Sequence, residues 1–313
     1  MKTASLSAAT AKPSPEAAEA SASGQPSGAD RRIGVRFMLL SVGCFTANTL
    51  LLKYLGSIRG VDFSLALLTR ALLGVVIVFF FFNSRRPLEM RAAITDPRLV
   101  LRGLLGVAGT AAFYWTVPEL GAGKATLIGT TYALFGTLFA AIFLRERLSR
   151  GRVAALLTAF AGIALLTGSD MSGGAVFGFA ELVALAGALS AGWVVGLIRQ
   201  LTTRYSNSTI YFSQCFWIGL TVAPLACFRS AWPGWEGVGF LAVGAVAAGY
   251  GQIALVQGFR HLEVATGSSI QMGLPVMASL GGFLLFGESF SLLQIAGAAL
   301  TLLGTWRVVT AKH

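Results

Sequence analysis

Long apolar stretches alternate with short polar breaks along most of the chain. Four of the stretches, residues 125–144, 209–228, 237–259 and 264–287, contain no acidic or basic residue. A helix needs about 20 predominantly apolar residues to cross a hydrocarbon layer about 30 Å thick. Each of these four stretches is therefore long enough to form a membrane-spanning helix.

The hydropathy pattern of the whole chain predicts ten such helices, because the breaks contain charge, proline, glycine or asparagine, which end helices and form loops. We place the helices at residues 35–55, 62–82, 99–118, 124–144, 151–169, 175–198, 209–228, 237–259, 264–287 and 290–309. The predicted fold class is an all-α integral membrane protein with ten transmembrane helices. Residues 1–34 are expected to form a disordered cytoplasmic tail, because the start of the chain is rich in Ala, Ser and Pro.

The composition agrees with this class. Hydrophobic residues make up 55% of the chain and charged residues 12%, whereas about a quarter of the residues of a soluble domain are charged. In a membrane protein the net charge of +11 indicates basic loops and anionic lipid, not a nucleic-acid partner. Cys44, Cys215 and Cys227 lie in apolar stretches without the spacing of metal ligands, so we expect no metal and no cofactor.

Basic residues are distributed very unevenly over alternate loops. With the N-terminus inside, the outer side holds four: Lys53, Arg59, Lys124 and Arg229. The inner side holds Arg31, Arg32, Arg36, Arg85, Arg86, Arg91, Arg98, Arg102, Arg145, Arg147, Arg150, Arg152, Arg199, Arg204, Arg260, Arg307 and Lys312. Since basic loops stay in the cytoplasm, we predict a multi-pass protein of the bacterial inner membrane with both termini cytoplasmic.

The chain also resembles itself in two halves, residues 35–169 and 175–309, each with five predicted helices. A shift of 142 residues aligns Gly162 with Gly304. Because five is odd, the second half must enter the membrane in the opposite orientation. Inverted repeats of this kind are typical of carriers that expose one site alternately to the two faces of a membrane.

Several segments resemble a known family. Residues 114–166 and 261–305 are similar to the EamA repeat of the drug/metabolite transporter superfamily, the latter with Pro275 in mid-helix and Gly287-Glu288 at the helix end. Residues 178–200 are similar to the start of that family's second repeat. The resemblance covers about residues 36–310. It implies two inverted five-helix repeats around a central cavity and transport of small organic metabolites such as amino acids, nucleoside-like compounds, vitamins or drugs.

Arg70 is the clearest charge inside a predicted helix. At that depth a charge costs at least about 2.5–3.5 kcal/mol unless it is paired or faces water. One interpretation is that Arg70 binds a carboxylate of the substrate as a forked donor. The alternative is a structural arginine bonded to carbonyl groups or to an acid such as Glu181, and the resemblance favours this alternative slightly.

Glu181 is the candidate for proton coupling, because a carboxylate in a dry bundle can exchange a proton during transport. The alternative is an ionised acid stabilised by the N-terminus of its helix. Polar and aromatic side chains in apolar helices complete the candidate set, because a buried amide needs a partner in the bundle interior and aromatic rings line pockets for organic ligands. The further candidates for substrate binding are Asn48, Tyr114, Trp115, Tyr132, Trp193 and Gln271.

The leading prediction is a secondary carrier of a small organic metabolite that works by alternating access. A membrane-embedded enzyme is the alternative, but no HExxH, GxSxG or paired-Asp motif supports it. A channel is disfavoured by the inverted duplication. No Walker A motif is present, so this chain is not expected to use ATP. The predicted partners are a small-molecule substrate and the lipid bilayer, with a homodimer left open.

Overall fold

A computed structural model describes residues 28–81, 88–143, 150–168, 178–262, 267 and 270–310. Across those residues the chain forms helices and no strand, so the all-α prediction is confirmed. The elements are α2 (Gly28–Lys53), η1 (Tyr54–Ile58), α3 (Phe63–Phe81), α4 (Met90–Thr95), α5 (Pro97–Leu120), α6 (Ala122–Thr130), α7 (Tyr132–Phe143), α8 (Arg150–Gly168), α9 (Phe179–Arg204), α10 (Asn207–Arg229), α11 (Gly234–His261), α13 (Gly273–Phe286) and α14 (Leu292–Thr310).

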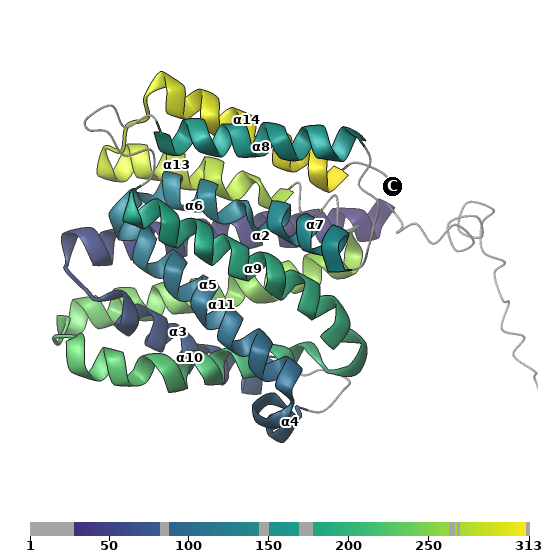
Figure 1. Cartoon of the computed structure of the whole chain (residues 1–313). Coiled ribbons are helices and arrows are strands. Elements are labelled where there is room, and N and C mark those ends of the chain that lie inside the picture. The colour runs from purple at the N-terminus through teal and green to yellow at the C-terminus, as the bar shows by residue number, and fades with distance from the viewer. Residues whose placement is uncertain are drawn as a thin grey trace, which may run out of the picture.

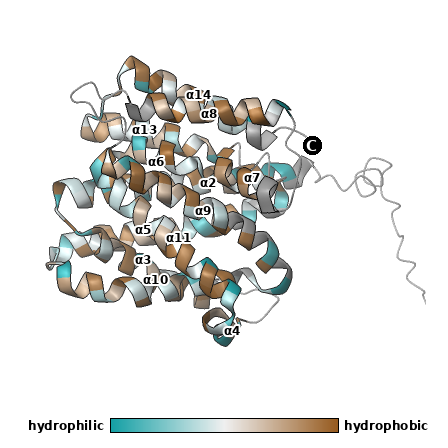
Figure 2. Ribbon diagram, viewed as in Figure 1, coloured by the Kyte–Doolittle hydropathy of each residue, from teal (hydrophilic) through white to brown (hydrophobic). Residues whose placement is uncertain are grey.

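Within the described ranges, five helical segments are long and apolar enough to cross a membrane. They are Arg31–Ile58, Phe63–Phe80, Pro97–Leu120, Ser208–Arg229 and Gly234–Leu255. Every one of the ten predicted segments overlaps a helix, whereas ten crossings remain a prediction. Figure 2 shows hydrophobic residues along most of the helix lengths. Large apolar side chains also face outward, among them Phe80, Phe228 and Leu292.

The predicted helix at 124–144 is divided into α6 and α7 at Thr131. The hydroxyl groups of Thr130 and Thr131 donate hydrogen bonds to the carbonyl oxygens of Leu127 and Ile128. Back-bonding of this kind competes with the regular backbone ladder and bends helices. Two consecutive threonines therefore supply the local reason for the break.

The helices pack in equivalent pairs. α5 packs on α9 as α11 packs on α2, and α3 and α8 pack on their counterparts α10 and α14. Figure 1 shows α8 and α14 side by side along one edge of the bundle, and it places the start of α2 and the end of α14 on the same side of the molecule. Close packing depends on small residues: a Cβ at Gly192 would lie only 2.9 Å from the nitrogen of Gly136.

The contact between α8 and α14 relates residues that the 142-residue shift aligns. A Cβ on Gly162 would collide with the backbone at Gly297 and Thr301. A Cβ on Gly304 would collide with the backbone at Ala155 and Ala159, the counterparts of those two residues. Along this contact the residue numbers rise in α8 as they fall in α14, so the two helices are antiparallel. Each helix makes the same contacts with its partner as the partner makes with it.

Candidate functional site

Three polar side chains from three helices meet in the interior of the bundle. Arg70 of α3 donates from Nη1 to the hydroxyl of Tyr114 on α5, at 3.3 Å. The Tyr114 hydroxyl in turn donates to Oδ1 of Asn48 on α2, at 3.4 Å. Tyr114 is only 1% exposed, and Asn48 is buried. The structure therefore brings together three of the side chains that were predicted to bind substrate.

Arg70 is held by an aromatic ring and has no acidic partner among the described residues. Its guanidinium carbon lies 5.5 Å from the centre of the Tyr114 ring, within the range of a cation–π interaction. The pair between Arg70 and Glu181 that the sequence left open does not form, since Glu181 binds Lys124 instead. A neutral ring and hydroxyl stabilise the cation without cancelling its charge. Arg70 therefore keeps its capacity to bind an anion.

A small cavity lies beside this group. Asn48 and Tyr114 supply its polar lining, and apolar residues of α2, η1, α3 and α11 supply the rest. Its volume is about 10 Å³, far below the roughly 300–1,000 Å³ of pockets that hold organic ligands. In this conformation the cavity is too small for most organic metabolites.

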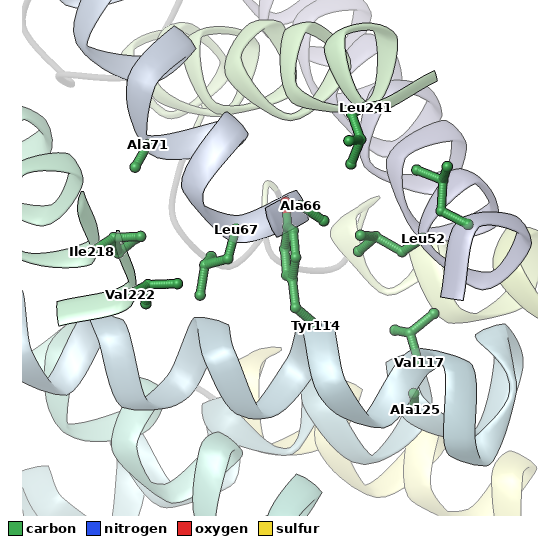
Figure 3. Packing of buried hydrophobic residues seen from close by; sticks show 11 residues of the cluster. Leu52, Ala66, Leu67, Ala71, Tyr114, Val117, Ala125, Ile218, Val222 and Leu241 are labelled. Carbon is green, nitrogen blue, oxygen red and sulfur yellow. The ribbon is translucent and has the colours of Figure 1, made fainter. Parts of the chain in front are cut away.

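An apolar cluster closes the bundle on one side of the cavity. Leu52, Leu67, Val117 and Val222 are buried members that come from α2, α3, α5 and α10. Figure 3 shows these side chains converging around the Tyr114 ring, with Ala125 of α6 and Leu241 of α11 at the margin. Helices α2, α5 and α10 end near this cluster and α3 begins there, at the end of the bundle that carries the four basic residues assigned to the outer side.

Ion pairs join the two halves of the chain at this end. All four basic residues assigned to the outer side take part, and each binds an acid from the other half. The pairs are Lys124–Glu181 at 2.8 Å, Arg59–Glu236 at 2.7 Å, Arg229–Asp62 at 3.8 Å and Lys53–Glu288 at 3.9 Å. We call these four pairs the outer ion-pair set. Two charged side chains of the set, Lys124 and Glu181, are each only 9% exposed.

Glu288 does more than pair with Lys53. Its carboxylate accepts hydrogen bonds from the backbone nitrogens of Ala122, at 2.8 Å, and Gly123, at 3.3 Å. These nitrogens begin α6, and a helix N-terminus favours an anion. Gly121, just before them, has a φ of 89°, which favours glycine. The loop after α13 is thereby fixed to the start of α6 in the other half.

The other predicted residues have different surroundings. Trp115 packs edge-on against Phe179 at 5.7 Å, and Trp193 packs against Phe139 at 5.0 Å. Trp193 is 39% exposed on the surface of the bundle. The side-chain nitrogen of Gln271 lies 3.6 Å from the sulfur of Met38. Tyr132 begins α7, directly after the break at Thr131.

Arg102 was counted among the cytoplasmic loop arginines, yet the structure buries it. It lies on α5 and is 5% exposed, and its Nε and Nη1 atoms have no hydrogen-bond partner in the part of the chain that the structure describes. Tyr211 and Cys215 of α10 are its electrostatic neighbours, as they are of Arg70. Arg102 lies only five residues after Pro97, the first residue of α5. An arginine so close to the start of a helix is expected at the membrane surface, so the sequence gave no sign that it is buried.

The helical membrane fold, its polar interior and the ion pairs between its halves are features of a multi-span membrane transporter. The sequence profile described as the EamA-like transporter family matches residues 32–168 and again residues 178–310. The chain belongs to this family, as the resemblance predicted. Its fold class, an all-α integral membrane protein, is thereby confirmed.

Known relatives carry transport names. The pseudopaline exporter CntI of Pseudomonas aeruginosa is 27% identical over 243 residues, which cover 74% of this chain and 80% of that protein. An uncharacterised transporter of Archaeoglobus fulgidus is 23% identical over 69% of this chain and 78% of its own length. A crystal structure that is 20% identical shares the fold with a TM-score of 0.57, covering 88% of this chain and 96% of that one.

Proposed function

We propose that the protein is a secondary carrier that moves a small organic anion across the membrane by alternating access. The observation that carries this proposal is Arg70, a cation in the interior of the bundle that is bonded to Tyr114 and has no acid among the described residues. A forked guanidinium beside a hydroxyl and an amide is a suitable binding site for a carboxylate.

The contact between α8 and α14 supports two inverted halves. The two-fold axis that relates two antiparallel helices is perpendicular to them. When the helices cross the membrane, this axis therefore lies parallel to the membrane plane. Repeats related in this way form carriers in which one half rocks against the other around a central site. The placement of the start of α2 and the end of α14 on one side fits this topology, and we propose that this side is cytoplasmic.

The closed end supports alternating access. The apolar cluster around Tyr114 and the outer ion-pair set together close the outer end of the bundle, and the cavity beside Asn48 is small. Opening this end requires the ion pairs between the halves to separate. The structure would then correspond to the state that is closed on the outer side.

Glu181 offers a route for coupling to protons. Its carboxylate is buried against Lys124, so a proton bound there would remove the attraction that joins α9 to α6. The measurement is transport against pH for Glu181→Gln beside the parent protein. An unchanged pH profile would dismiss coupling at this residue.

The decisive experiment is transport in proteoliposomes with a panel of labelled metabolites, loaded inside or outside the vesicles. A relative named as an exporter supports export, which the inside-loaded vesicles measure. Arg70→Ala should abolish transport of an anionic substrate, whereas Arg70→Lys should retain part of it as a point charge. Normal transport by both variants would contradict the role of Arg70, and transport of no compound would contradict the carrier.

A further inference from the structure

Arg102 is a buried cation whose hydrogen-bonding needs are not met by the described protein. Arg102 is 5% exposed, and its Nε and Nη1 atoms have no acceptor among the described residues. A guanidinium has five donors and cannot accept a hydrogen bond, so only an acceptor can satisfy it. A buried donor left without an acceptor destabilises the protein, and a charged donor does so more strongly. The position therefore favours the binding of an anion.

Arg102 and Arg70 approach the same part of α10 from two helices. Tyr211 and Cys215 are electrostatic neighbours of both arginines. The packing there is close, because a Cβ at Gly74 would lie 2.6 Å from the sulfur of Cys215 and 3.1 Å from the hydroxyl of Tyr211. Two cations thus flank one pair of side chains. Neither has an acidic partner in the described parts of the chain.

We propose that Arg102 is a second anion-binding residue of the transport site, and that the substrate carries two carboxylate groups. One carboxylate binds Arg70 and the other binds Arg102. This inference rests on the proposed function, which assigns only Arg70 and a single anionic group. It narrows the substrate class from organic anions to dicarboxylates.

The depths of the two arginines favour an elongated dicarboxylate over a single carboxylate. α3 begins at the end of the bundle that carries the outer ion-pair set, and Arg70 lies about 10 Å along it at 1.5 Å per residue. α5 begins at the opposite end, and Arg102 lies about 7–8 Å along it. One carboxylate can form a fork with one guanidinium at a time. A substrate with two separated carboxylates neutralises both.

The test measures binding by isothermal titration calorimetry on the detergent-purified full chain. The probes are linear dicarboxylates from malonate to suberate, with the monomethyl and dimethyl ester of each. Parent protein should bind at least one dicarboxylate, and its monomethyl ester should bind about 30-fold more weakly or worse, because one arginine then loses its partner. Equal affinity for the acid and its monoester, or binding of no dicarboxylate, would overturn the proposal.

Variants assign the second carboxylate to Arg102. Arg102→Gln should lose the preference for the dicarboxylate over its monoester, and Arg102→Lys should keep part of it. Arg98→Gln, which removes an exposed arginine one turn earlier on α5, is the matched control and should bind like the parent. A preference that survives in Arg102→Gln would refute the role of Arg102. If Arg102→Gln does not fold, the ester comparison on the parent protein still tests whether the site binds two carboxylates.

Failure of this inference can be told apart from failure of the carrier. Transport of a singly charged organic anion that depends on Arg70, and not on Arg102, would refute the dicarboxylate class and leave the proposed function intact. An anionic lipid headgroup is the other source of carboxylate or phosphate. Vesicles of phosphatidylserine against phosphatidylcholine distinguish it, because a lipid ligand would compete with the dicarboxylate only in the former.

Discussion

The hydroxyl of Tyr205 donates a hydrogen bond of 2.7 Å to the carboxylate of Asp96. Asp96 is the N-cap of α5, and Tyr205 follows the end of α9. The bond therefore joins the two halves at the end of the bundle opposite the outer ion-pair set. Arg204 adds a longer contact of 3.9 Å to the same carboxylate, from a side chain that is 70% exposed. Removing the hydroxyl should loosen this end.

The bond between Tyr205 and Asp96 should make stability depend on pH. The Tyr205 hydroxyl holds the pKa of Asp96 below its usual value. The hydrogen bond to ionised Asp96 therefore contributes fully to stability above the pKa of an aspartate in the unfolded chain, about 4. This contribution is lost as the pH falls through the lower pKa that Asp96 has in the folded protein. Tyr205→Phe should melt below the parent at neutral pH, and the difference should shrink below about pH 4. Thermal unfolding of the two proteins in detergent, at neutral and at acidic pH, measures this difference in melting temperature. A difference that does not change with pH would contradict the prediction.

The pair between Lys124 and Glu181 should contribute more to stability than the exposed pair between Arg59 and Glu236. Lys124→Met leaves a buried carboxylate unpaired and should cost about 3–5 kcal/mol of the unfolding free energy. Arg59→Met should cost no more than about 1 kcal/mol, since its partner is 61% exposed. The charge exchange of Lys124→Glu with Glu181→Lys should recover part of the loss. Denaturant unfolding of the four proteins tests this order.

Substitution of either glycine in the contact between α8 and α14 should destabilise the protein to the same extent. Gly162→Val and Gly304→Val each place a side chain against the backbone of the facing helix, and each should cost about 1–3 kcal/mol. Gly151→Val, on α8 in open space, is the control and should behave like the parent. Melting temperatures in detergent provide the measurement. A large loss in one glycine variant with none in the other would contradict the two-fold relation.

A covalent link across the outer ion-pair set should stop transport. Arg59→Cys and Glu236→Cys, joined by a short bismaleimide, fix the two halves together where their charges now meet at 2.7 Å. The control is Trp232→Cys with Trp235→Cys, because these exposed rings contact each other at the start of α11, within one half of the chain. Both are made with Cys227, the exposed native cysteine, changed to serine. Unimpaired transport by the first linked protein would show that this end stays shut throughout the cycle.

Part of the site could be predicted from composition along the helices. Arg70, Tyr114 and Asn48 are polar residues in apolar stretches, and polar groups in a membrane seek one another. Their contact follows from that requirement. The positions of the helices also followed, because the polar breaks are short and the apolar runs are long.

The rest depended on packing between distant segments. Lys124 lies in a stretch with one proline and two glycines that suggests a loop, but its ion pair with Glu181 holds it inside the bundle. Arg102 stands near charged residues at the start of its helix, and only the position of α10 shows that it is buried. Hydropathy does not say which face of a helix meets a neighbour. For this reason Trp193 was placed among the cavity residues, although it is partly exposed.

The outer ion-pair set affects how strongly each surface of the protein attracts a charged solute. Each of its four cations is neutralised by an acid, whereas Arg91, Arg98 and Arg307 are exposed and lack an acidic partner among the described residues. Charges on a protein surface attract opposite charges over roughly a Debye length, about 8 Å at physiological salt. Among the described residues, a negatively charged solute is therefore attracted more strongly to the surface that carries these arginines than to the outer ion-pair set, so added salt should slow loading from the arginine side more than from the other.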